Sequence, residues 1–179
     1  MYTVMENKKL QKIIIIVAAV FVLVSLFFMF GKTLFSSKTA RNSDSTVMPE
    51  ATGTTNEIRA TTVVQQDFVC STDTISKVGI VFVRDKYIEG VHLALELYDG
   101  NKLLASSTVN VAKIEEQHRT YIEPSSKLSG MKNKTLTIKI YPVEKEDTGM
   151  MIMMSNKVNS NYLFGNKTIK GSLCFSVTE

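Results

Sequence analysis

Residues 91–99 read VHLALELYD, and apolar and polar side chains alternate through this stretch. The same alternation occurs in residues 134–141, which read KTLTIKIY. A period of two is typical of a β-strand that turns one face to a core and the other to water. A DGN turn at 99–101 follows the first stretch, and a proline at position 142 follows the second. Both stretches are therefore predicted to be half-buried antiparallel strands.

The turn at 99–101 predicts a hairpin between strands at 91–98 and 102–111, because Asp and Gly tolerate the positive φ of a tight turn. Other short apolar or alternating runs, most of them separated by Gly, Asn, Asp or Ser, predict further strands. These are residues 61–70, 79–84, 119–123, 150–154, 161–164 and 168–178. No long helical pattern interrupts the series. About eight antiparallel strands favour an all-β jelly-roll sandwich over the seven-stranded immunoglobulin arrangement.

Residues Ile13 to Phe30 (IIIIVAAVFVLVSLFFMF) carry no charge and no helix-breaking residue. A helix of this length spans roughly 27 Å, close to the roughly 30 Å hydrocarbon core of a bilayer. Leu34 and Phe35 could extend the helix past Lys32 if that lysine snorkels, so we expect a transmembrane helix over 13–35, with the lipid bilayer as the partner of Ile13–Phe30. Three lysines precede it in residues 1–12. The positive-inside rule then predicts a cytoplasmic N-terminal tail and an extracytoplasmic C-terminal domain, in a single-pass membrane protein.

A cleaved secretory signal peptide is the alternative interpretation of this N-terminal segment, because it also begins with a basic region and an apolar run. The run is longer than the usual apolar part of a signal peptide. In addition, Lys38 occupies the −3 position relative to Ala40, where a cleavage site needs a small residue. These two observations favour a retained helix, and the sequence leaves cleavage open.

Residues 36–57 are rich in Ser and Thr and contain almost no large apolar side chains, which predicts a linker. The remaining residues, 58–179, are enough for one sandwich domain with its own core. The formal net charge of the chain is +4, and two of these units come from the N-terminal tail. The predicted domain is therefore nearly balanced in charge, and no nucleic-acid partner is expected.

The two cysteines, Cys70 and Cys174, lie near the first and last predicted strands. In an oxidising compartment they could form a disulfide that joins the two ends of the domain. However, the alternation turns Cys70 to the same face as Phe68 and turns Cys174 to the opposite face. Two small buried thiols are the favoured alternative.

Outward side chains of the two clearest strands suggest a ligand site. If the strands are neighbours in one sheet, His92, Glu96 and Tyr98 share a surface with Tyr141. Sugars bind to aromatic faces flanked by convergent polar groups, so a glycan would fit such a surface. Three further candidates, Arg84, Tyr87 and Tyr121, lie in or beside predicted loops, where binding groups are common. An ordinary solvated sheet face is the alternative to a site.

Motifs for catalysis and metal binding are absent from the sequence. His92 and His118 are the only histidines, and neither has a second ligand at metal spacing. There is no nucleophile-elbow motif and no phosphate-binding loop. We therefore expect a protein that is not an enzyme and has no cofactor and no metal.

Several residues carry a resemblance to a known family. They are Gln66-Asp67-Phe68, Ile75-Ser76, Gly79-Ile80, Gly90 before the Leu93, Leu95, Leu97, Asp99 strand, and Leu128 and Gly130 before the Leu136, Ile138, Ile140 strand. Over roughly residues 60–178 the chain resembles galactose-binding-like jelly-roll ectodomains of bacterial membrane-anchored proteins, some of them linked to cell-surface polysaccharide assembly. The resemblance implies a non-catalytic module that binds glycan or assists cell-envelope polysaccharide assembly. The alternative is a scaffolding module that docks a partner membrane complex.

Overall fold

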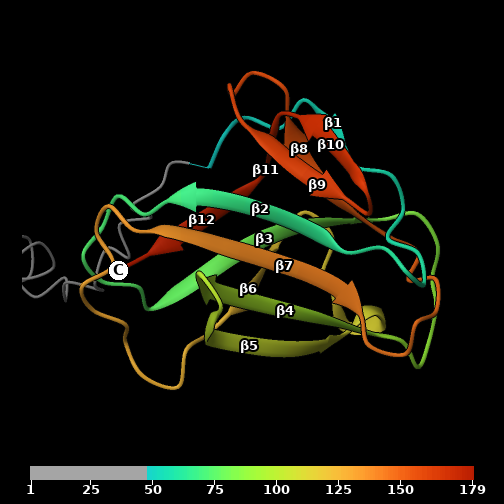
Figure 1. Ribbon diagram of the computed structural model, residues 1–179. Coiled ribbons are helices and arrows are strands. Elements are labelled where there is room, and N and C mark those ends of the chain that lie inside the picture. Colours follow the sequence, from blue (N-terminus) through green and yellow to red (C-terminus); the bar gives the residue numbers. More distant parts are fainter. Residues whose placement is uncertain (1–47) are drawn as a thin grey trace, which may run out of the picture. The chain divides into compact units, whose positions relative to one another are not determined.

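The computed structural model describes residues 48–179. The predicted transmembrane helix, the cytoplasmic tail before it and the first part of the predicted linker lie outside these residues. Among residues 48–179, no helix is long and apolar enough to span a bilayer. The described residues form two antiparallel β-sheets that enclose one hydrophobic core, which is a β-sandwich (Figure 1).

One sheet, named here the β7 sheet, contains six strands. In spatial order they are β10 (Lys167–Lys170), β9 (Asn161–Phe164), β2 (Val64–Val69), β7 (Thr135–Pro142), β4 (His92–Asp99) and β5 (Lys102–Asn110). The two strands with the clearest alternation, β4 and β7, are direct neighbours at its centre. The predicted hairpin is confirmed, because β4 and β5 pair from Asp99↔Lys102 onward around Gly100, whose φ is +57°.

The other sheet, named here the β3 sheet, is built around β3 (Lys77–Arg84). One edge of β3 pairs with β6 (Arg119–Ile122). Along its other edge, residues 77–80 pair with β12 (Phe175–Thr178) and residues 82–84 pair with β8 (Met150–Ser155). The short strands β11 (Ser172–Leu173) and β1 (Gly53–Thr54) pair with β8.

The alternation seen in the sequence fills the core. Leu93, Leu95 and Leu97 of β4 are completely buried, as are Leu136, Ile138 and Ile140 of β7. Opposite them, the β3 sheet contributes buried side chains that include Val78, Ile80 and Phe82. Burying each such side chain stabilises the fold by roughly 1.5–3 kcal/mol. This shared core holds the two sheets together and leaves the polar side chains of β4 and β7 on the outer face.

A buried amide also links the two sheets. Gln66 of β2 donates from Nε2 to Oγ of Ser172 at 2.8 Å, and its Oε1 accepts the backbone N–H of Leu173 at 2.6 Å. Gln66 points into the sandwich although it is polar, and these bonds satisfy both ends of its amide. The amide thereby fixes β11 of the β3 sheet against β2 of the β7 sheet.

The single strand predicted at 168–178 is instead three strands, β10, β11 and β12. Gly171 separates β10 from β11 with φ of +129°, a conformation that side chains rarely adopt. A Cβ at this position would also lie 2.7 Å from the carbonyl oxygen of Ser155. The chain leaves the β7 sheet at this glycine and continues in the β3 sheet. Alternation alone does not reveal this crossing between sheets, because the residues before and after Gly171 are both in β-strands.

The end of the segment predicted as a linker is paired to β8. Backbone N–H groups of Thr52, Thr55 and Ile58 donate to Met154, Ile152 and Met150 of β8 at 2.8–2.9 Å. The strand β1 lies within this segment. The threonine hydroxyls add to these contacts, because Thr55 Oγ1 accepts the backbone N–H of Ile152 at 3.0 Å and Thr52 Oγ1 accepts that of Asn156 at 2.9 Å. This polar segment therefore covers one edge of the β3 sheet.

The two cysteines are free thiols in the structure, so the disulfide left open by the sequence is not formed. Cys70 Sγ donates to the carbonyl oxygen of Thr72 at 3.3 Å, whereas Cys174 Sγ donates to the carbonyl oxygen of Pro49 at 3.5 Å. Both residues are buried, and burial raises the pKa of the Cys174 thiol.

Candidate functional site

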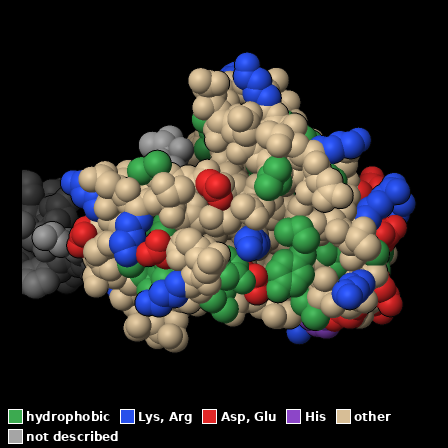
Figure 2. All heavy atoms as spheres, viewed as in Figure 1, with side chains coloured by type: hydrophobic (Ala, Val, Ile, Leu, Met, Phe, Trp, Pro, Cys, Tyr) green, Lys and Arg blue, Asp and Glu red, His purple; other side chains and the backbone are tan. Residues whose placement is uncertain are grey.

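The register between β4 and β7 brings most of the predicted ligand-binding residues onto one surface. Glu96 lies opposite Lys139, Tyr98 opposite Thr137, and Tyr141 opposite Ala94. All of these side chains occupy the alternate positions to the buried leucines and isoleucines, so they face outward. Figure 2 shows this face of the β7 sheet, with hydrophobic side chains, a class that includes tyrosine, gathered around basic and acidic ones.

Glu96 organises the centre of this face. Tyr98 donates its phenol proton to Oε2 of Glu96 at 2.8 Å, and Tyr141 donates to Oε1 at 2.8 Å. The hydrogen bond to the carboxylate raises the pKa of Tyr141 to about 12 and also raises the pKa of Tyr98. Both phenols therefore stay protonated at neutral pH, and both rings are held in fixed orientations by a charge-assisted hydrogen bond.

The two tyrosine rings are not equally available to a ligand. The ammonium of Lys139 lies 4.5 Å from the centre of the Tyr98 ring, a cation–π contact that occupies one face of that ring. Tyr141 instead lines a hollow of about 270 Å³. The other lining residues are Ala60, Thr61, Thr62, Val63, Pro142 and Lys145. We name this space the Tyr141 hollow, and it is slightly smaller than the roughly 300 Å³ at which small-molecule pockets begin.

His92 lies at the start of β4, the strand that also carries Glu96 and Tyr98, but its contacts are structural. Its backbone N–H and its Nδ1 each lie 2.7 Å from a different oxygen of the Glu144 carboxylate. The bond from the backbone N–H of His92 lowers the pKa of Glu144 below its usual value. His92 thus attaches the loop after β7 to the start of β4, and its ring is not directed to the Tyr141 hollow by any described contact.

The remaining three predicted residues lie away from this face, on or beside the β3 sheet. Arg84 donates from Nη2 to the carbonyl oxygen of Ile114 at 2.7 Å, and its guanidinium lies 5.3 Å from the ring centre of Tyr87. Tyr121 is in β6 and has the ammonium of Lys77 4.2 Å from its ring centre. The structure therefore does not unite all seven candidates in one site.

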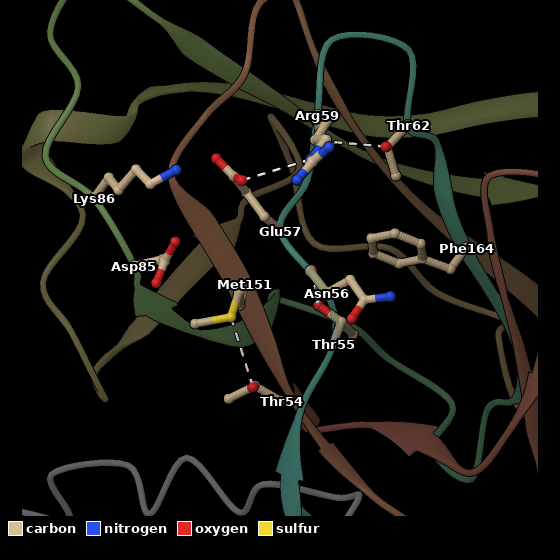
Figure 3. Close-up of a pocket in the computed structure, with 10 residues that line it drawn as sticks. All are labelled: Thr54, Thr55, Asn56, Glu57, Arg59, Thr62, Asp85, Lys86, Met151 and Phe164. Carbon is tan, nitrogen blue, oxygen red and sulfur yellow. Dashed lines mark hydrogen bonds and ion pairs between the residues drawn. The ribbon is translucent and has the colours of Figure 1, made fainter.

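A larger pocket was not predicted from the sequence. It has a volume of about 630 Å³, and Figure 3 shows its lining. Asp85 and Lys86 extend from one side and Phe164 faces from the other, with Met151 between them. The other lining residues are Thr54, Thr55, Asn56, Glu57, Arg59 and Thr62. They come from four separate segments of the chain, so no local motif indicates the pocket.

Charges of both signs line this larger pocket. The Glu57 side chain is only 11% exposed, and its carboxylate accepts the backbone N–H of Gly149 at 3.2 Å while pairing with Arg59 at 3.6 Å. Among the described residues, the side chains of Asp85 and Lys86 have no hydrogen-bond or ion-pair partner. The pocket offers polar binding groups and the ring of Phe164, which packs against the core and has no hydrogen bond of the kind that fixes Tyr141. Within residues 48–179, no group of three His, Cys, Asp or Glu side chains is placed to hold a metal ion.

The fold and this surface define the protein as a β-sandwich with a tyrosine-bearing outer sheet face beside a hollow. No protein-family model matches the chain, and no curated protein gives a match either. A functional proposal therefore depends on the chemistry of the face itself.

Proposed function

We propose that the chain is a non-catalytic, membrane-anchored extracytoplasmic module that binds glycan at the Tyr141 hollow and assists cell-envelope polysaccharide assembly. The observation that carries this proposal is the carboxylate of Glu96, which holds the Tyr141 phenol at 2.8 Å beside the hollow. A ring fixed in this way offers a sugar an apolar face without a large loss of side-chain entropy on binding.

Polar groups around the ring suit the hydroxyls of a sugar. Thr61 and Thr62 line the hollow together with Tyr141. On the same outer face, the hydroxyl of Thr137 donates to Asp67 at 2.7 Å. A second hollow of about 170 Å³ lies beside Asp67 and Leu163. Two neighbouring hollows on one sheet face would accommodate an extended polymer better than a single small molecule.

The strand order supports a jelly roll as the finer description of this sandwich. Along the chain, β2 lies in the β7 sheet, β3 in the β3 sheet, β4 and β5 in the β7 sheet, and β6 in the β3 sheet. The alternation continues through β7, β8 and β9. A jelly roll crosses between its two sheets in this manner. The predicted helix at 13–35 would anchor the domain outside the cytoplasmic membrane, as the lysines of residues 1–12 indicate.

The proposal can be tested with the full chain in lipid nanodiscs on an array of cell-envelope glycans. We expect binding to at least one glycan, a loss of at least tenfold in Tyr141→Ala, and no change in Tyr87→Ala. Tyr87 is a suitable control because it is 63% exposed and lies away from this face. Failure of the unaltered chain to bind any glycan would overturn the proposal.

A further variant distinguishes the two pockets. Lys86→Ala alters the larger pocket and leaves the Tyr141 hollow intact. We expect this variant to bind glycan as the unaltered chain does. If Lys86→Ala abolishes binding while Tyr141→Ala does not, the assignment to the Tyr141 hollow is wrong.

A scaffolding function is the second candidate, and exposed apolar side chains on the same face favour it. Val63 and Leu163 are 42% and 38% exposed, and Leu103 of β5 is 47% exposed. Such side chains fit a protein partner in a membrane complex better than a glycan. Cross-linking from photoreactive groups at these three positions, in membranes, would yield one stoichiometric protein partner if this function holds.

A further inference from the structure

The loop 143–149 follows β7 and contributes Lys145 to the lining of the Tyr141 hollow. It is attached to the sandwich at both ends. At its start, the backbone N–H of Val143 donates to His92 at 2.9 Å, and the Glu144 carboxylate accepts two bonds from the same residue. At its end, Asp147 accepts the backbone N–H of Ala60 at 3.1 Å, and Thr148 donates to Ile58 at 2.8 Å through its hydroxyl. The loop is therefore held in one shape.

Lys145 lies between these two attachments with an unusual backbone conformation. Its φ is +58°, in the left-handed region that non-glycine residues rarely adopt. The loop is bonded to the sandwich on both sides of Lys145, through Glu144 and Asp147, and we attribute the conformation to these attachments. Strained residues of this kind occur often where a side chain must be aimed at a ligand. Here the aimed side chain lines the Tyr141 hollow.

Among the described residues that line this hollow, Lys145 is the one with a charged side chain, and that side chain is exposed. Within residues 48–179 it has no hydrogen-bond or ion-pair partner. The nearest acids are engaged elsewhere: Glu144 with His92, Asp147 with Ala60, and Glu96 with the two phenols. Glu146 is exposed on the loop and does not line the hollow. A ligand in the hollow would therefore meet a free positive charge at close range.

We propose that the ligand of the Tyr141 hollow is an acidic sugar, whose carboxylate or phosphate group binds the ammonium of Lys145 while the sugar ring contacts Tyr141. This inference rests on the proposed glycan-binding function and specifies the chemistry of its ligand. An ammonium beside an anionic group forms a charge-assisted hydrogen bond, which is about twice as strong as a neutral one. The carboxylates of Glu96, Glu144 and Asp147 repel an anion, so the attraction of the Lys145 ammonium has to outweigh them, which it does only at short range.

The probes are tetragalacturonic acid, its fully methyl-esterified form and inorganic phosphate, each titrated into the full chain in nanodiscs. The ester replaces each carboxylate with an uncharged methyl ester on the same sugar backbone, so it measures the sugar contact without the charge. We expect the acid to bind at least fivefold more tightly than the ester, with an affinity that falls as salt increases. Tyr141→Ala should weaken both the acid and the ester.

The variant that tests the charge is Lys145→Asn, because Asn tolerates positive φ and leaves the loop unstrained. It should lower acid binding to the level of the ester and leave ester binding unchanged. Lys132→Asn is the matched control, since it removes the same charge from an exposed position before the opposite end of β7. This control should bind the acid and the ester as the unaltered chain does. Thermal unfolding at the same temperature in all variants would show that each substitution leaves the fold intact.

The outcomes separate the two proposals. If acid and ester bind equally through Tyr141 and Lys145→Asn has no effect, the acidic specificity is wrong and the glycan-binding face stands. If neither oligosaccharide binds in a manner that depends on Tyr141 while the glycan array still shows Tyr141-dependent binding, the acidic-sugar assignment is wrong and the glycan-binding function stands. If the array shows no binding either, the proposed function falls. If only inorganic phosphate binds, the hollow is an anion site and not a sugar site, which also overturns the inference.

Discussion

Tyr141 of β7 and Glu96 of β4 are joined across two neighbouring strands by a hydrogen bond of 2.8 Å between the phenol and Oε1. A second phenol, that of Tyr98, reaches the other oxygen of the same carboxylate. The residues are not directly opposite in the register, because Glu96 faces Lys139 and Tyr141 faces Ala94. The contact is therefore diagonal, and it fixes the aromatic ring beside the hollow.

The first prediction concerns the ionisation of Tyr141. The bond to Glu96 raises the pKa of Tyr141 from 10 to about 12, because the carboxylate stabilises the protonated phenol. This stabilisation is fully present below pH 10 and is lost as the pH rises through about 12. We expect Glu96→Gln to move the pKa of Tyr141 toward 10, as measured by the ultraviolet absorbance of tyrosinate.

Tyr141→Phe removes the Tyr141 titration and so identifies its contribution among the six tyrosines of the chain. Its difference spectrum against the unaltered chain should titrate near pH 12. An identical alkaline titration of the unaltered chain and Glu96→Gln would show that the phenol and carboxylate are not bonded.

The second prediction compares two leucines of the β4–β5 hairpin. Leu95 is completely buried, whereas Leu103 is 47% exposed. We expect Leu95→Ala to lower the free energy of unfolding by about 2–5 kcal/mol, because it removes core contacts and leaves a cavity. Leu103→Ala should lower it by less than about 0.5 kcal/mol. Urea titration of the full chain in nanodiscs measures both values, and equal losses would contradict the assigned faces of the hairpin.

Much of the fold could be predicted from the sequence because alternation determines which side chains of a strand share a face. It correctly assigned Leu93, Leu95 and Leu97 to the core, and it turned Glu96 and Tyr141 outward. Alternation does not determine which strands are neighbours. The hydrogen bond between Glu96 and Tyr141 requires β4 and β7 to pair in one particular register. Long-range packing determines that register, so it could not be predicted from the alternation.

Other parts of the site had no signal in the sequence. The larger pocket combines Glu57, Asp85, Met151 and Phe164 from separate segments, so no spacing rule applies. The positive φ of Lys145 also has no sequence signature, because lysine does not favour that conformation. It arises from the attachments of the loop to β4 and to residues 58–60.

The third prediction concerns Gly149, which directly precedes β8 and packs closely against Lys86, two residues after the end of β3. Its φ is +63°, and a Cβ at this position would overlap the carbonyl oxygen of Lys86. We expect Gly149→Ala to lower the free energy of unfolding by more than about 2 kcal/mol, through backbone strain and overlap together. Gly130→Ala is the control, because its φ is similarly positive and its Cβ would meet no atom within 4 Å.

The control separates the two causes of this loss. Strain alone at Gly130 should cost about 1 kcal/mol. The difference between the two alanine variants then measures the overlap with Lys86. If both variants unfold at the same urea concentration, the close approach of the two chain segments is not present in solution.

The last prediction concerns the buried amide of Gln66, which joins β2 to β11. Gln66→Leu keeps a side chain of similar size but leaves the buried N–H of Leu173 without its acceptor. An unsatisfied buried N–H costs about 1–3 kcal/mol, so the free energy of unfolding should fall by that amount. Gln65→Leu, on the outer face of the same strand, should change it by less than about 0.5 kcal/mol. Because the amide holds the two sheets together, the Leu173 amide hydrogen should also exchange with solvent faster in Gln66→Leu, and unchanged exchange at Leu173 would exclude Gln66 as the link between the sheets.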